Sequence, residues 1–385
     1  MPVNFQQIRT QIKEMGDRTH AYEQALITKL DVAKHLLEEN HDQNEMLREK
    51  VSLALRKVDR LRCAVPVNEP LDAVITPTNG ELPGCILAAD GSQIMPDPHE
   101  AHLFGVINIG IFRYFPNQLK TPEEITLTNL LYHDKLYNKS GGLINDDMIS
   151  LMRDLQERQF LAELAEEATP PVITLTDGPI ELFHEPTDTK EPDPAFLEYL
   201  QILRDLAKMK TMTAGYVDRP RADLLVRLLE ISKIDENTSE NDIRNHSLQG
   251  ITDASLLEPI LPPGCRSAVL EMQSISSKFF TNEIALHFFY LNVGTANHPS
   301  LARVEIPAWM AEDSASLEIL HRTLLAQCQQ LANTPYPYAL IRAHEIALLT
   351  HEDKNYLDNM VGIELLKHNV TPGIKSHKQS LKDLV

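Results

Sequence analysis

The apolar and polar positions of the chain first predict a helical region. Residues 5–62 contain no proline and one glycine, and they are rich in Glu, Gln, Lys, Leu and Ala, which favour helix. Apolar residues recur at approximately helical spacing in two sets: Leu26, Leu30, Val32, Leu36 and Leu37, and then Val51, Leu53, Leu55, Val58 and Leu61. The polar run 41–44 separates the sets. The pattern predicts two long helices that form a hairpin or a dimer contact.

A proline-rich stretch separates this region from a series of strands and helices. Residues 64–84 contain four prolines and two glycines, which indicates a linker. The apolar run 85–89 predicts a strand that ends at an Asp-Gly-Ser turn, and residues 103–115 predict one or two further strands. Residues 147–168 carry an apolar stripe at helical spacing, and another short strand follows Pro171.

Strands and helices then alternate to the end of the chain. This alternation predicts an α/β fold, with a mixed β-sheet flanked by helices and an N-terminal helical extension. We expect an N-terminal helical region over residues 1–63, a linker over 64–84 and one catalytic-type domain over 85–385. The polar stretch 235–264 is expected to be an insertion in that domain, exposed as a solvent loop or a partner contact.

Composition and charge narrow the class of protein. The chain is 43% apolar and 24% charged, which is typical of a globular protein and excludes a largely disordered one. It has neither an apolar run long enough to cross a membrane nor a secretory signal. Its four cysteines stand singly, which favours a reducing cytoplasm. The 36 Lys and Arg against 55 Asp and Glu give a net charge of −19, which at first argues against DNA binding.

Two carboxylates occupy similar positions in the predicted sheet. Asp90 and Asp177 each follow an apolar strand and precede a glycine. Ligands of open α/β sheets lie beyond the carboxyl ends of the strands, so both side chains are candidates to bind Mg²⁺ or Mn²⁺. Asp-Gly is also a common turn dipeptide, and this structural interpretation has about equal weight.

A third carboxylate is expected from the helix between them. Glu157 lies at the edge of its apolar stripe, and Glu163 is the alternative. An Asp–Glu–Asp cluster on an RNase H-like sheet is suited to phosphodiester hydrolysis, because bound metal ions activate water and stabilise the leaving oxygen. The sequence has no zinc-ligand set, P-loop or nucleophile elbow that would favour another chemistry.

Six segments in order resemble the NurA nucleases, over roughly residues 86–357. These segments are AADGSQIMPD, the helix with Arg153 and Glu157, LTDGPIELF, AGYVDRPRADLL, the strand pair containing FFYLNVG and ARVEIPAWM, and YPYALIRAHEIALL. The resemblance implies that Asp90, Glu157 and Asp177 bind Mn²⁺, with Mg²⁺ as the alternative cofactor. It further implies that His344 is a metal ligand or general base and that Tyr336 lies near the substrate.

The resemblance also implies an activity and partners. The expected activity is Mn²⁺-dependent cleavage of DNA, of the single-stranded endonuclease and 5′–3′ exonuclease type. The expected partner is a HerA-type hexameric helicase/translocase that acts in DNA end resection, repair and homologous recombination. The expected substrates are single-stranded DNA and DNA ends, and the expected assembly is a homodimer.

Basic residues suggest where DNA would bind. Arg219 and Arg221 follow a predicted strand, and Lys278 and Arg303 lie in later segments, so these four are candidate phosphate contacts, although scattered surface cations are as often merely solvated. The alternatives are a non-catalytic adaptor of a translocase and an actin-like phosphotransferase. An acidic exterior would make unaided DNA binding weak, which suits a nuclease supplied with DNA by a translocase.

Overall fold

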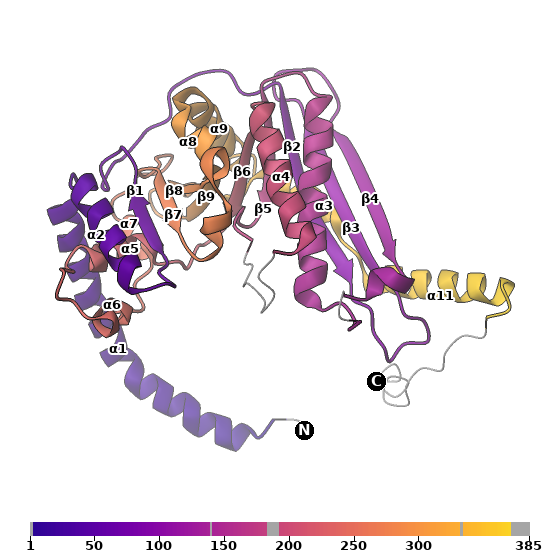
Figure 1. Cartoon of the computed structure of the whole chain (residues 1–385), viewed down its shortest axis with the longest axis horizontal. Helices are drawn as coiled ribbons and strands as arrows, with labels where there is room; N and C mark the ends of the chain where they lie inside the picture. Colours follow the sequence, from indigo (N-terminus) through magenta and orange to yellow (C-terminus); the bar gives the residue numbers. More distant parts are fainter. Residues whose placement is uncertain (1–2, 139–140, 183–191, 332–333, 371–385) are drawn as a thin grey trace. The chain divides into compact units, whose positions relative to one another are not determined.

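The computed structural model describes residues 3–138, 141–182, 192–331 and 334–370 (Figure 1). The chain forms two compact units. The first unit consists of Met1–Pro77, Val217–Thr281 and Ala285–Ala311, and the second of Thr78–Tyr216, Asn282–Ile284 and Glu312–Val385. Each unit is therefore assembled from segments that are distant in sequence. No helix in the described segments is both long and apolar enough to cross a membrane.

The first unit begins with the helices α1 (Phe5–Asn40) and α2 (Asn44–Lys57), which confirm the predicted N-terminal helical region and its break. Asn4 caps α1 by accepting hydrogen bonds from two backbone amides of its first turn. The C-terminal part of α1 buries Ala33, Leu36 and Leu37, whereas its N-terminal part is exposed.

The strands of the first unit are antiparallel and follow the order β1-β7-β8-β9. Their bounds are β1 (Cys63–Pro66), β7 (Leu270–Gln273), β8 (Leu286–Asn292) and β9 (Leu301–Pro307). The helical elements are α5 (Leu224–Ile231), α6 (Glu240–Arg244), α7 (Asp253–Leu257), η2 (Ser276–Phe279) and α8 (Ala308–Glu312), the last of which runs to the unit boundary.

The segment 235–264, expected to be an exposed insertion, contributes to the core of the first unit. It contains α6 and α7, and Leu248, Ile251 and Leu256 are buried. The Asp253 side chain is also fully buried, where it accepts hydrogen bonds from the backbone amides of Leu225 and Val226 at the start of α5. The prediction of an exposed insertion was wrong because most residues of the segment are polar, and only a few of them anchor it in the core.

The second unit is built on a mixed sheet in the order β6-β5-β2-β3-β4. The strands β2 (Cys85–Ile94), β5 (Val172–Asp177) and β6 (Met212–Val217) are parallel, whereas β3 (Gly105–Tyr114) and β4 (Glu123–Leu131) continue the sheet in antiparallel pairing. The helical elements are η1 (His133–Leu136), α3 (Asp146–Glu166), α4 (Pro194–Lys208), η3 (Asn282–Ile284), α9 (Ser314–Cys328), α10 (Tyr338–Ala347) and α11 (His351–Lys367).

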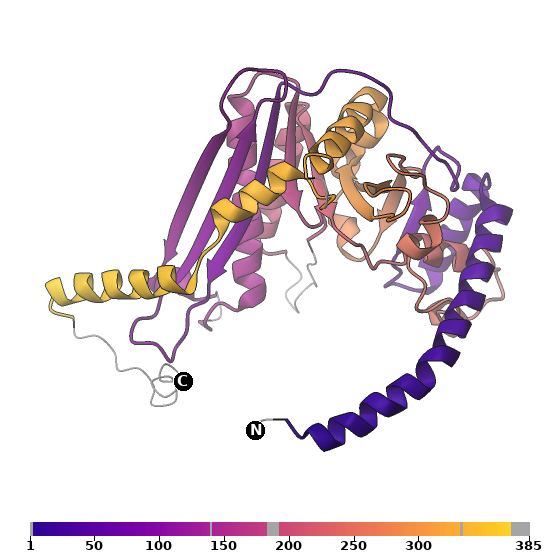
Figure 2. The same ribbon diagram turned by 180° about the vertical axis from the view of Figure 1, so that it is seen from behind.

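Helices cover both faces of this sheet. Figure 1 shows α3 and α4 in front of the strands, and the view from behind in Figure 2 shows the helix of residues 338–347 over the other face. Gly110 of β3 makes the close approach of α10 possible, because an added Cβ would lie 2.4 Å from the backbone nitrogen of Ala347. The sheet and its flanking helices confirm the predicted fold class.

The expected end of strand β2 at Asp90 is wrong. The strand continues to Ile94, and Asp90 is paired with Gly110 of β3 within the antiparallel ladder. The parallel pairing with β5 does stop there, because Ala89 and Thr176 are its last paired residues. Asp90 therefore lies at the point where β2 is no longer paired with β5 but is still paired with β3, so its backbone is rigid.

Candidate active site

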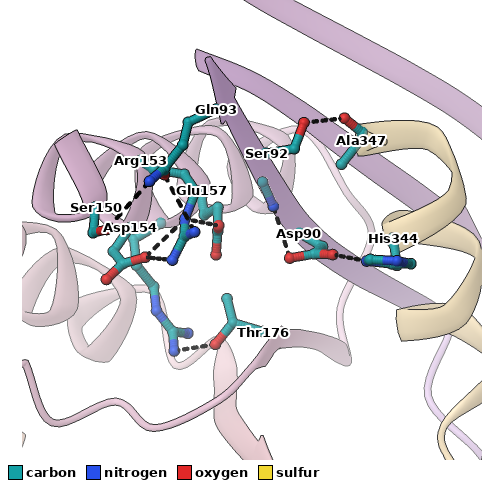
Figure 3. Close-up of polar contacts among 12 residues, drawn as sticks. Asp90, Ser92, Gln93, Ser150, Arg153, Asp154, Glu157, Thr176, His344 and Ala347 are labelled. Carbon is teal, nitrogen blue, oxygen red and sulfur yellow. Dashed lines mark hydrogen bonds and ion pairs between the residues drawn. The ribbon is translucent and has the colours of Figure 1, made fainter. Parts of the chain in front are cut away.

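Asp90 projects from β2 toward helix α10. Its Oδ2 lies 2.7 Å from Nδ1 of His344, and its Oδ1 accepts a hydrogen bond from the backbone amide of Gly91 (Figure 3). Only 16% of the Asp90 side chain is exposed, against 64% for His344. The carboxylate is thus fixed in place, while the imidazole remains open to solvent.

The next residue of β2 brings helix α3 to the strand. Successive side chains of a strand point to opposite faces, so position 91 faces away from His344 and toward α3. A Cβ on Gly91 would lie 2.7 Å from Oε1 of Glu157 and 2.5 Å from Cγ of Arg153. Gly91 therefore leaves the space that these two side chains use, and Glu157 reaches the strand directly beside Asp90.

Acidic and basic side chains of α3 form one charged cluster. Glu157 and Arg153 are one helical turn apart, with Arg153 Nε 3.4 Å from Glu157 Oε1, and Arg153 Nη2 is 2.9 Å from Asp154 Oδ1. Burial raises the pKa of Glu157 well above its ordinary value, and the charges of Asp154 and Asp90 raise it further, while Arg153 opposes them. Burial likewise raises the pKa of Asp154. A cation placed here would relieve the repulsion among these carboxylates.

The other two carboxylates weighed from the sequence have different surroundings. Asp177 is the exposed last residue of β5. Since Ala89 is paired with Thr176, the next residues, Asp90 and Asp177, are level along the sheet. Glu163 is exposed and accepts a hydrogen bond from Gln159. The structure therefore places Glu157, and not Glu163, beside Asp90.

A cavity of about 210 Å³ lies between α3 and the end of β5. Its walls carry charges of both signs and a few apolar groups, from Arg153, Asp154, Glu157, Arg158, Thr176, Asp177, Pro179, Glu181, Leu182 and Tyr199. The helical pattern of the sequence predicts Asp154 on a solvated face and does not single out Arg158. Their spacing was the available signal, because Asp154 stands three positions from Glu157 and four from Arg158, and residues three or four apart are neighbours on a helix surface.

The residues fit a divalent cation in part. Carboxylate oxygens and an imidazole nitrogen suit Mn²⁺ or Mg²⁺, and the space at Gly91 lets Glu157 reach the strand that carries Asp90. In the described parts of the chain, however, no three His, Cys, Asp or Glu side chains converge closely enough to hold an ion. Asp90 contacts His344, and Glu157 lies beside Gly91, but these side chains and Asp177 do not converge into one complete ion site here.

Tyr336, predicted to lie near the substrate, precedes α10. Its ring packs edge-on against Tyr216, with the ring centroids 5.2 Å apart. Tyr216 is the residue of β6 that is paired with Asp177. Tyr336 therefore packs on β6, the strand that neighbours the one carrying Asp177. Its side chain is half-buried.

The four candidate DNA contacts all belong to the first unit. Arg219, Arg221 and Lys278 are exposed. Arg303 is buried in β9, where its Nη2 lies 2.7 Å from Oε1 of the fully buried Glu305. The Arg303 guanidinium therefore forms an ion pair inside the unit. The alternation of apolar and polar residues along β9 does not reveal this, because the strand is buried on both faces. The assignment of these residues to DNA stays a prediction.

A mixed sheet that carries an aspartate on a central strand, with a glutamate supplied by a flanking helix, is the arrangement of RNase H-like nucleases. The NurA domain family matches residues 85–348, and the chain belongs to this family of nucleases. The match covers every strand and helix that contributes to the site.

A NurA nuclease of known structure has a similar fold. The NurA nuclease from Sulfolobus solfataricus is 13% identical with a TM-score of 0.51, and the alignment covers 94% of this chain and 98% of that one. The catalytic domain of human endonuclease V is 14% identical with a TM-score of 0.34, over 82% of this chain and 96% of that one. Comparison with curated proteins finds no match.

Proposed function

We propose that this chain is a Mn²⁺-dependent DNA nuclease that hydrolyses phosphodiester bonds at the site around Asp90. The observation that carries the proposal is that two carboxylates from separate elements lie at adjacent positions of β2: Asp90 is held there by His344, and Glu157 of α3 reaches Gly91, close enough for the charge of Asp90 to raise its pKa. Membership of the NurA family supports the class of reaction. Mg²⁺ is the alternative ion.

The residues of the site divide the chemistry among them. Asp90 and Glu157 would hold the ion, with Asp177 as a further candidate ligand at the end of β5. A bound divalent ion supplies an activated water molecule and neutralises charge on the phosphate. His344 is exposed and hydrogen-bonded to Asp90 through Nδ1, so its Nε2 is placed to exchange a proton with solvent or substrate.

We propose single-stranded DNA and DNA ends as substrates, cleaved in the single-stranded endonuclease and 5′–3′ exonuclease mode. The partner would be a HerA-type translocase in end resection and homologous recombination. Family membership supports this assignment. The net charge of −19 supports it independently, because an acidic protein binds free DNA weakly and gains from a partner that delivers the strand.

We further propose that the protein is a homodimer through α1. Phe5, Ile8, Ile12 and Met15 follow the three-and-four spacing of a coiled-coil seam, and between 40% and 65% of each side chain is exposed. In a parallel pair, Arg18 would face Glu23 of the second copy, which gives opposite charges beside the seam. A second copy of α1 is therefore a suitable occupant of this stripe.

A cytoplasmic location is also part of the proposal. The four cysteines, Cys63, Cys85, Cys265 and Cys328, are all free and buried. Free thiols of this kind are compatible with a reducing compartment and give no sign of adaptation to an oxidising one.

The experiment that tests the proposed function is a cleavage assay on end-labelled single- and double-stranded DNA. Mn²⁺, Mg²⁺ and EDTA are compared for the natural chain and for Asp90→Ala. Cleavage that requires Mn²⁺ and is lost in the variant supports a nuclease. A natural chain that cuts neither substrate with either ion contradicts the proposal and favours an adaptor of the translocase.

A further inference from the structure

Arg158 is a buried arginine whose guanidinium is only partly satisfied. Its side chain is 2% exposed, and Nη2 donates a hydrogen bond to Oγ1 of Thr176 at the end of β5. Nη1 is also buried, and it has no hydrogen-bond partner among the described residues. Buried polar groups are nearly always paired, so an unpaired N–H on a charged side chain calls for a physical explanation.

The surroundings of Arg158 indicate what would pair with it. Arg158 lines the same cavity as Glu157 and Asp177, the candidate metal ligands of the site. The cavity volume of about 210 Å³ is several times the share of one water molecule in the liquid, roughly 30 Å³, so it can admit a group as large as a phosphate. The guanidinium is therefore within reach of a group that enters beside the carboxylates.

The donor geometry of arginine favours a phosphate oxygen. A guanidinium carries its N–H donors in a rigid plane that matches phosphate, and such charge-assisted bonds are stronger than neutral ones. Because Nη2 is already used by Thr176, Arg158 is held in one orientation with the other nitrogen available. This arrangement is preorganised, since the protein has fixed the side chain before any ligand enters.

We propose that Nη1 of Arg158 binds a non-bridging oxygen of a phosphodiester in single-stranded nucleic acid, next to the carboxylates of α3 and β5. The inference rests on the proposed nuclease function and adds a substrate contact to it. Arg158 thus has two roles. One nitrogen ties α3 to the end of β5, and the other receives the substrate.

The competing explanation is that Arg158 only braces Thr176. Thr176→Val removes the hydroxyl acceptor while keeping the shape of the side chain, so it breaks the brace and leaves the Arg158 charge in place. Arg158→Gln removes the charge and the planar donor set. A purely structural arginine would make the two variants behave alike, whereas a phosphate contact separates them.

The test measures binding of a fluorescein-labelled 20-nucleotide oligo-dT to the full chain in EDTA, over a range of NaCl concentrations. Arg158→Gln is expected to weaken binding about tenfold, as for one lost charge-assisted bond. Loss of one phosphate contact should also make the slope of log K against log salt shallower by about 0.7. Thr176→Val is expected to keep the slope of the natural chain.

Equal slopes for the natural chain and Arg158→Gln would overturn the inference. Circular dichroism checks that each variant is folded. If Arg158→Gln does not fold, Arg158→Lys decides, because it keeps the charge but loses the planar fork. If Arg158→Lys then binds oligo-dT as tightly as the natural chain, the proposed contact between the planar guanidinium and a phosphate oxygen is refuted.

The same proteins separate this inference from the proposed function. Cleavage with Mn²⁺ is measured apart from binding in EDTA. A natural chain that binds with an Arg158-dependent slope but does not cut DNA contradicts the nuclease and leaves the phosphate contact standing. A chain that cuts DNA with no Arg158-dependent slope supports the nuclease and refutes the phosphate contact.

Discussion

Asp90 and His344 are separated by 254 positions in the sequence, yet Asp90 Oδ2 and His344 Nδ1 lie 2.7 Å apart. One side chain comes from the central strand β2 and the other from α10, so the pair depends on the packing of α10 on the sheet. We expect Asp90→Ala to lower Mn²⁺-dependent cleavage of single-stranded DNA by at least about 100-fold. Asp177→Ala is expected to have a similar effect.

A control must show that Asp90→Ala and Asp177→Ala reduce cleavage without unfolding the protein. Thermal unfolding of both variants should remain close to that of the natural chain, because neither carboxylate is a core anchor. Unchanged cleavage in either variant would remove that residue from the site.

Gly91 gives a sharper test, because it has no side chain of its own to take part in the chemistry. A Cβ at this position would lie 2.7 Å from Glu157 Oε1. Gly91→Ala is therefore expected to displace Glu157, to reduce cleavage and to lower the free energy of unfolding by about 1–3 kcal/mol. Gly16→Ala is the matched control, since an added Cβ in α1 meets nothing within 4 Å and should stabilise by roughly 0.5–1 kcal/mol. Equal effects of the two substitutions would contradict the geometry at Gly91.

Glu157 and Glu163 differ in burial, although both lie on α3. Glu157 is 5% exposed beside Arg153, whereas Glu163 is exposed. Glu157→Gln is expected to lose cleavage, while Glu163→Gln should retain it and change stability by no more than about 0.5 kcal/mol. Steady-state cleavage rates of the two variants at saturating Mn²⁺ provide the measurement. Loss of cleavage in Glu163→Gln alone would exchange the assigned roles.

Asp253 predicts a pH dependence of stability outside the site. Burial raises its pKa from 3.8 to about 6, although hydrogen bonds from Leu225, Val226 and Tyr290 oppose the shift. Between these two values the folded chain holds a proton that the unfolded chain releases. The contribution of Asp253 to the free energy of unfolding is therefore largest below about pH 4. It falls by about 3 kcal/mol as the pH rises through about 6.

The Asp253 contribution can be isolated with Asp253→Asn, which cannot ionise. Free energies of unfolding for both proteins are measured between pH 4 and pH 7. As the pH rises, the free energy of unfolding of the natural chain should fall relative to that of Asp253→Asn. A difference that stays constant with pH would show that Asp253 keeps its ordinary pKa.

The α1 stripe predicts the effect of a charge on assembly. Ile12→Glu is expected to raise the dissociation constant of the proposed homodimer by about tenfold or more for each substituted chain. The reason is that burial of one isoleucine is worth at least about 1.5 kcal/mol. Lys13→Glu, on a neighbouring exposed position outside the stripe, is the matched control. Light scattering over a concentration series measures the change. A natural chain that is monomeric at every concentration would contradict the dimer.

Local pattern identified much of the fold. The apolar run before Asp90 predicted a strand, and the stripe around Leu155 predicted α3, since both features depend on periodicity alone. The end of β2 was missed because Asp-Gly-Ser has the composition of a turn, whereas pairing with β3 keeps these residues extended to Ile94. Tertiary pairing here overrode local propensity.

The arrangement around the carboxylates was less accessible from sequence. Glu157 and Glu163 both interrupt the apolar pattern of α3, and only the packing of Gly91 shows which one reaches the sheet. The burial of Arg158 and Arg303 was also hidden, because charged residues are expected at the surface unless a partner is known. Long-range contacts, and not residue types, decide these positions.

The division of the second unit between distant segments has a consequence for synthesis of the protein. Asp90, Glu157 and Asp177 belong to Thr78–Tyr216, whereas His344 lies in Glu312–Val385, after the last segment of the first unit. At a ribosomal rate of about 5–20 residues per second, His344 is made roughly ten to thirty seconds after Asp177. The carboxylates therefore exist on the nascent chain well before their imidazole partner, and the Asp90–His344 pair is formed only after residue 344 has been made.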